Sequence, residues 1–163
     1  MPSPQKSTGE KTSQEVKTDS NERGSREHKK ENENKKRRKV TDQILLVEDE
    51  PLLGNLLERR LDEEGFEILR AEDGQEALEK VKNNELDLIL LDIILPKISG
   101  FEFLKKIREA PQVGDIPVVI ISNLGQESDI KKGKELGAVG YFVKAELSIE
   151  GLVSQVKEFL NNR

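Results

Sequence analysis

Residues 86–96 read LDLILLDIILP, an apolar run that carries Asp87 at its start and Asp92 near its end. A short run of leucine and isoleucine is typical of a strand that is buried on both faces, as in a parallel sheet. An unpaired charge inside such a strand would be costly, whereas open α/β folds place their sites at the carboxyl ends of the strands. Asp92 is therefore either a cap for the following segment or part of a functional site.

Four further segments have the character of strands, and each is followed by a segment that is expected to be a helix, although the one at residues 126–136 has few apolar residues. These strand-like segments are residues 44–47, 66–69, 117–121 and 137–143. Strict alternation of strands and helices predicts a parallel sheet with helices on both faces. We therefore predict an α/β fold of the flavodoxin-like, doubly wound (βα)5 type. Its five parallel strands would have the order 2-1-3-4-5, with residues 66–69 at one edge.

The composition excludes several classes of chemistry. The chain has no cysteine and one histidine, His28, in a polar stretch. Disulfide frameworks, thiolate zinc sites, cysteine nucleophiles and multi-histidine metal sites are therefore excluded. No apolar run approaches the roughly 20 residues that span a bilayer, and the N-terminus lacks the apolar segment of a secretory signal. We expect a cytoplasmic protein without a transmembrane segment.

Charge divides the chain into two parts. Residues 1–40 contain 12 Lys and Arg and 7 Asp and Glu, whereas residues 41–163 contain 15 and 25. Residues 1–40 have almost no large apolar side chain, so they are predicted to be a disordered basic tail, and residues 41–163 the folded domain. The cluster KKRRK at residues 35–39 could bind nucleic acid or an anionic membrane surface, act as a localisation signal, or be a solvated charge run.

Polar residues stand at the ends of four predicted strands: Glu48 and Asp49, Asp92, Ser122 and Lys144. The carboxyl ends of parallel strands meet at one edge of the sheet, so these side chains should converge. Clustered carboxylates repel one another, and a cation or proton uptake relieves that repulsion. Oxygen ligands of this kind suit Mg²⁺. A carboxylate beside such an ion, a lysine and a hydroxyl suits phosphoryl chemistry, in which the carboxylate can be the nucleophile.

The chain resembles the receiver domain of two-component response regulators over about residues 43–162. The matching motifs are VEDE at 47–50, LDIILP at 91–96 with Gly100, IS at 121–122 and GAVGYFVK at 137–144. The resemblance implies a signalling phosphoprotein rather than an enzyme. Such a protein takes a phosphoryl group from a sensor histidine kinase or a histidine phosphotransfer protein in a phosphorelay.

The resemblance also implies roles for the residues that would hold the metal and accept the phosphoryl group. Asp92 would be the phosphoacceptor. Asp49, Asp92 and the backbone carbonyl of Ile94 would bind Mg²⁺, while Glu48 would act mainly through water. Read without the resemblance, Glu48 and Asp49 could simply complement a helix dipole.

A second group of residues would respond to the phosphoryl group. Lys144 would pair with one phosphoryl oxygen, and Ser122 would donate a hydrogen bond to another. Tyr141 would then move from an outer to an inner position and change the face formed by the last two helices and the strand between them. Tyr141 could also be ordinary edge packing. The weakly apolar helix predicted at residues 126–136 is the segment that we expect to rearrange.

The sequence departs from the family pattern beside the site. Ala145 follows Lys144 where the family usually has proline after a cis bond, and a cis Lys144–Ala145 bond would cost about 2.5–4 kcal/mol. We expect either a trans bond with a shifted loop or a strained bond, which leaves the position of Lys144 open. Asn123, with Ile94 and Leu124, would restrict water near Asp92, so we expect a long-lived phosphoryl state.

Two other functions compete with a phosphorylation switch. A phosphatase of the haloacid-dehalogenase type needs a second aspartate two residues after the first, where this chain has Ile94. A phosphorylation-independent interaction module on the same fold is an alternative that Ala145 leaves open, while the presence of the other site residues argues against it: Asp49, Asp92, Ser122 and Lys144. Leu52 and Leu56 are expected in the core, although they could dock a kinase. The sequence ends soon after the last helix, so we expect a stand-alone receiver without a DNA-binding domain, acting on an unknown output protein.

Overall fold

The computed structural model describes residues 41–163 and the single residue Pro4, so the predicted tail, residues 1–40, lies outside the described part apart from Pro4. Within residues 41–163, five strands alternate with five α-helices. The strands are β1 (Gln43–Val47), β2 (Glu67–Ala71), β3 (Leu88–Leu91), β4 (Val118–Ser122) and β5 (Gly140–Val143). The helices are α2 (Pro51–Glu63), α3 (Gly74–Asn83), α4 (Gly100–Glu109), α5 (Glu127–Glu135) and α6 (Ile149–Asn161), with a 3-10 turn, η1 (Lys144–Glu146), after β5.

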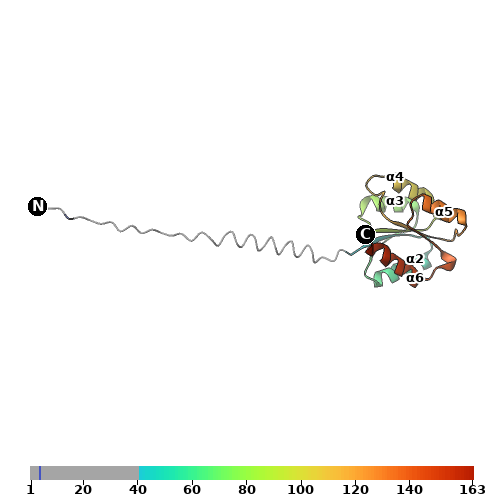
Figure 1. Ribbon diagram of the computed structural model, residues 1–163, viewed down its shortest axis with the longest axis horizontal. Helices are drawn as coiled ribbons and strands as arrows, with labels where there is room; N and C mark the ends of the chain where they lie inside the picture. The colour runs from blue at the N-terminus through green and yellow to red at the C-terminus, as the bar shows by residue number, and fades with distance from the viewer. Residues whose placement is uncertain (1–3, 5–40) are drawn as a thin grey trace. The chain divides into compact units, whose positions relative to one another are not determined.

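The sheet has the predicted topology. Its strands are all parallel and lie in the order β2-β1-β3-β4-β5. Helices α2 and α6 cover one face, and helices α3, α4 and α5 cover the other (Figure 1). The doubly wound fold is therefore confirmed.

Strand β3 is the centre of the sheet, and all four of its residues are buried. Leu88 and Leu90 pack with the buried residues of α2 and α6, whereas Ile89 and Leu91 pack with those of α3 and α4. Because helices cover both faces, both sets of side chains must be apolar. This explains the uninterrupted apolar sequence of β3.

The ends of two helices follow local signals in the sequence. Gly65, with a φ of 90°, follows α2 in the left-handed region that favours glycine. Before α6, the Oγ of Ser148 accepts a hydrogen bond of 3.2 Å from the backbone N–H of Gly151. Glycine after a helix and serine before one are typical of these two positions. Among the described residues, every helix is too short or too polar to cross a bilayer.

Two of the four strands predicted at residues 44–47, 66–69, 117–121 and 137–143 differ from the prediction by more than one residue at an end. The strand expected at residues 137–143 begins only at Gly140, because Gly137 has a φ of 92° and forms a turn after α5. Strand β2 continues to Ala71, beyond the expected residues 66–69. This extension pairs Arg70 with Leu46 of β1.

Candidate functional site

The site lies where β1 and β3 end together. Val47 of β1 is in register with Leu91 of β3, and the N–H of Asp92 donates a 3.0 Å hydrogen bond to the carbonyl of Val47. Glu48 and Asp92 therefore leave the sheet at the same level. The parallel register of two adjacent strands is what brings these residues together across 44 positions of sequence.

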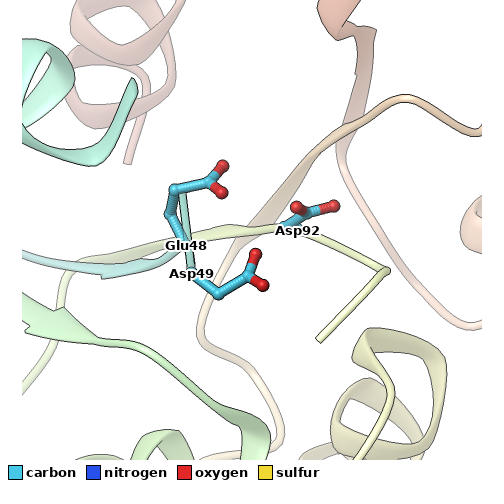
Figure 2. A group of neighbouring side chains, drawn as sticks. All are labelled: Glu48, Asp49 and Asp92. Carbon is cyan, nitrogen blue, oxygen red and sulfur yellow. The ribbon is translucent and has the colours of Figure 1, made fainter. Parts of the chain in front are cut away.

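Three carboxylates share the space beyond these strand ends. Carboxylate oxygens of Glu48, Asp49 and Asp92 all lie within 4.8 Å of one another, and Figure 2 shows the three side chains reaching into the same space. Glu48 is 1% exposed and Asp92 is 4% exposed, whereas Asp49 is open to solvent. Such proximity of like charges is unfavourable without a cation.

Lys144 places a cation beside two of these carboxylates. Its Nζ lies 2.7 Å from Oδ2 of Asp92 and 2.9 Å from Oε2 of Glu48. Burial opposes the charge of Lys144, but hydrogen bonds to Asp92 and Glu48 outweigh it, so the pKa of Lys144 is raised. Burial raises the pKa of Glu48 even though Lys144 and the N–H of Glu50 bond its charged form. Lys144 is therefore a charged bridge between the acidic residues of β1 and β3.

Ala145 does not move Lys144 away from the site. No cis peptide bond occurs among residues 41–163, so the Lys144–Ala145 bond is trans, which is one of the two expected arrangements. Lys144 begins the short turn η1, and its side chain still reaches Asp92.

Ser122 and Tyr141 meet at the loop that follows β4. Ser122 is fully buried, and its Oγ accepts a 3.3 Å hydrogen bond from the N–H of Leu124. The hydroxyl of Tyr141 donates a 2.5 Å hydrogen bond to the carbonyl of Leu124. A Cβ added at Gly133 of α5 would lie 3.1 Å from the Tyr141 ring. Tyr141 thus connects this loop to α5, while its expected inward movement stays a prediction.

The loop after β3 fixes the Asp92 carboxylate from the other side. The N–H of Ile94 donates a 3.2 Å hydrogen bond to Oδ1 of Asp92. Gly100 closes the loop, since its N–H donates a 2.8 Å bond to the carbonyl of Ile93. A Cβ on Gly100 would lie 2.3 Å from the carbonyl oxygen of Asp92, so the close approach requires glycine here. Metal ligation by the Ile94 carbonyl stays a prediction.

We expect Gly100→Ala to lower the free energy of unfolding by about 1–3 kcal/mol, because the added methyl group must push backbone rather than a flexible side chain. Urea denaturation measures this. The matched control is Gly151→Ala in α6, where a Cβ would meet Ser148 at an ordinary 3.5 Å. That variant should be as stable as the wild type or more so. Equal stability of Gly100→Ala and the wild type would contradict the close approach.

Leu52 and Leu56 are exposed on α2, contrary to the prediction from the sequence. They are 87% and 45% exposed, so the expectation that they lie in the core is wrong. Helix α2 instead faces the sheet with Gly54, Leu57 and Leu61. Helix α2 contains five leucines, so the helical spacing is compatible with more than one apolar face, and the sequence does not show which face is buried.

One residue near the site was missed by the sequence analysis. Arg70 of β2 directs its Nη2 towards the carbonyl oxygen of Glu48, at 3.5 Å. No motif marks it. The available signal was a charged residue close to the end of a largely apolar strand, beside the strand that carries Glu48.

Comparison with known proteins agrees with this geometry. The family model described as response regulator receiver domain matches residues 44–157. The gliding motility regulatory protein of Myxococcus xanthus is 38% identical over 113 residues, which are 69% of this chain and 14% of that protein. The transcriptional regulatory protein CpxR of Klebsiella pneumoniae is 40% identical over 117 residues, 72% of this chain and 48% of that protein. The chain thus spans less than half the length of either relative.

Solved structures show the same likeness. The receiver domain of the Francisella response regulator 1452 superimposes with a TM-score of 0.70 at 27% sequence identity. The match covers 75% of this chain and 98% of that domain. Fold, sequence match and the acidic site at the ends of β1 and β3 agree, and the chain belongs to the response regulator receiver domain family of two-component systems.

Proposed function

We propose that this domain accepts a phosphoryl group on Asp92 from the phosphorylated histidine of a sensor histidine kinase or histidine phosphotransfer protein. The observation that carries the proposal is the Lys144 ammonium, 2.7 Å from Oδ2 of Asp92, beside the carboxylates of Glu48 and Asp49. A nucleophilic carboxylate and a cation that can pair with transferred oxygens then lie in one site. The protein is a signalling component whose phosphoryl group is the signal.

In the transfer step, an oxygen of the Asp92 carboxylate forms a bond to phosphorus while the phosphorus–nitrogen bond of the donor histidine breaks. The electron pair of that bond stays on the imidazole nitrogen. Lys144 can turn from the Asp92 carboxylate to a phosphoryl oxygen and keep its contact with Glu48, 2.9 Å away. The site therefore needs no other cation from this chain.

The donor set fits Mg²⁺. It consists of oxygen atoms alone, and its carboxylates are close enough to share one small ion that retains water ligands. Asp49 and Asp92 would hold the ion directly, with the carbonyl of Ile94. Both oxygens of Glu48 already have partners, the N–H of Glu50 at 2.9 Å and Lys144, which favours a water-mediated role for Glu48. When bound, the ion neutralises charge on the phosphoryl oxygens.

A phosphoryl group on Asp92 would bias the loop after β4. Ser122 uses its oxygen as the acceptor for the N–H of Leu124, so its own hydroxyl proton can be donated to a phosphoryl oxygen. Tyr141 is bonded to the same loop through the carbonyl of Leu124. Helix α5 has a single buried residue, Gly133, and is therefore the helix most easily shifted. The responding face would include α5, β5 and α6.

Acetyl phosphate with Mg²⁺ tests the proposal. The intact mass should increase by one phosphoryl group, and chelation of Mg²⁺ should prevent the increase. Asp49→Asn should greatly slow labelling, because it removes the charge of an exposed carboxylate from the metal site. A wild-type domain that stays unlabelled would favour the alternative, a phosphorylation-independent interaction module.

We expect the phosphoryl state to last minutes or longer, because apolar side chains restrict attack by water. Ile94 follows Asp92 by two residues and is 55% exposed, while the partly buried Leu124 lies in the loop after β4, two residues beyond Ser122. Ile94→Ser should shorten the lifetime of phospho-Asp92, measured as loss of the phosphorylated mass. Val139→Ser is the control, since Val139 is 49% exposed but precedes β5, at the opposite end of that strand from Lys144. A wild-type half-life of seconds would contradict this expectation.

A further inference from the structure

Arg70 is a largely buried charged residue that the proposed phosphoryl site does not use. Its side chain is 18% exposed, and Nη1 lies 3.1 Å from Oε2 of Glu58 and 3.3 Å from Oδ1 of Asn55. Its Nε is buried without a hydrogen-bond partner among the described residues. A buried donor without a hydrogen-bond partner lowers the stability of the folded state. The position of the Arg70 side chain is therefore unfavourable for stability.

The backbone N–H and the backbone carbonyl of Glu48 are both bonded to residues of β2. The N–H of Glu48 donates a 3.0 Å bond to the carbonyl of Ala71. The carbonyl of Glu48 accepts from Nη2 of Arg70 at 3.5 Å. This carbonyl belongs to the peptide that joins Glu48 to Asp49. Its orientation therefore affects where both acidic side chains leave the backbone.

The guanidinium group of Arg70 occupies the space that a side chain at Gly54 of α2 would fill. A Cβ added at Gly54 would lie 2.0 Å from Nη2 of Arg70 and 2.5 Å from its Cζ. Gly54 is inside the helix, where glycine is less favourable than alanine. Two locally unfavourable features, the glycine and the unsatisfied Nε, thus coincide at the contact with Glu48. Such coincidences are expected at functional positions.

Resting on the function proposed above, we infer that Arg70 is a positioning residue for the magnesium site. Its guanidinium group, seated against Gly54, holds the Glu48 carbonyl and so presents Glu48 and Asp49 to the ion. In this role Arg70 would touch neither the metal nor the phosphoryl group. It acts through the backbone that carries two of the acidic residues.

A titration of the domain with MgCl₂, followed by the amide signals in ¹H–¹⁵N NMR spectra, tests this inference without any phosphorylation. Arg70→Ala should weaken Mg²⁺ binding about tenfold, as removal of groups that orient metal ligands does. Gly54→Ala should weaken it similarly, because the added methyl group displaces the flexible end of Arg70. The double variant should bind no more weakly than Arg70→Ala, since both changes remove the same contact.

The control is Arg59→Ala, which removes one positive charge from α2, the helix that carries Gly54. Arg59 is 78% exposed and pairs with Glu63, so Mg²⁺ affinity should change less than twofold. The NMR spectra also show whether each variant is folded. If Arg70→Ala does not fold, the Mg²⁺ affinity of Gly54→Ala tests the inference. Wild-type Mg²⁺ affinity in the folded Arg70 and Gly54 variants would overturn the role of Arg70. If Asp49→Asn abolishes binding in the same experiment, the proposed magnesium site is still supported. A wild-type domain without Asp49-dependent Mg²⁺ binding would overturn both.

Discussion

Asp92→Asn is expected to abolish phosphoryl uptake while the fold stays intact. The amide oxygen of asparagine is not a nucleophile at neutral pH, whereas its size matches that of aspartate. Lys144 keeps its 2.9 Å contact with Glu48, so no buried cation is left unpaired. Intact mass after treatment with acetyl phosphate and Mg²⁺ measures uptake, and thermal unfolding measures the fold.

The matched control is Asp87→Asn. Asp87 precedes the same strand, β3, at its opposite end, where its side chain accepts a 2.8 Å hydrogen bond from the N–H of Gln43. This variant should be labelled like the wild type. A phosphorylated mass in Asp92→Asn at the wild-type rate would show that another residue is the acceptor.

Lys144→Ala has the second large effect that we expect. It would leave the carboxylates of Glu48 and Asp92 buried beside each other without their cation. Removal of one partner from a buried ion pair costs about 3–5 kcal/mol, which urea denaturation at neutral pH should show. Phosphoryl uptake should also fall strongly, because the transferred oxygens lose the ammonium group. Lys131→Ala, at an exposed lysine that pairs with Glu135, should change stability by no more than about 0.5 kcal/mol.

The stability loss in Lys144→Ala should depend on pH. Burial already raises the pKa of Glu48, and Lys144 is one of the groups that oppose this shift. Without Lys144, the folded state should bind a proton at Glu48 more readily than the unfolded chain does. Stability then rises as the pH falls towards the raised pKa, so the difference from the wild type should shrink in mild acid. A difference that grows on acidification would contradict the geometry of the pair.

The sequence was sufficient for the topology because burial on both faces leaves a strong pattern. The uninterrupted apolar sequence of β3 is typical of an interior strand. The alternation of strands with helices then predicts the doubly wound arrangement. The convergence of Glu48, Asp49, Asp92 and Lys144 followed from one rule, that parallel strands end at one edge. The structure places these groups at that edge, while their roles in phosphoryl transfer remain proposals.

Features that depend on contacts across the sheet could not be read from the sequence. The exposure of Leu52 and Leu56 follows from how α2 is rotated against β1 and β2, and a helix with five leucines does not specify that rotation. The contact of Arg70 with Glu48 depends on the β1–β2 register and on the space left at Gly54. The late start of β5 depends on the backbone conformation of Gly137, since glycine tolerates both an extended and a left-handed φ.

The most direct measurement of the switch uses beryllofluoride, which mimics a phosphoryl group on aspartate, together with Mg²⁺. We expect its addition to the wild-type domain to change the amide NMR signals of Ser122, Leu124, Tyr141 and α5, and to leave Asp92→Asn unaffected. Wild-type spectra that do not change, or identical changes in Asp92→Asn, would contradict a phosphorylation switch centred on Asp92.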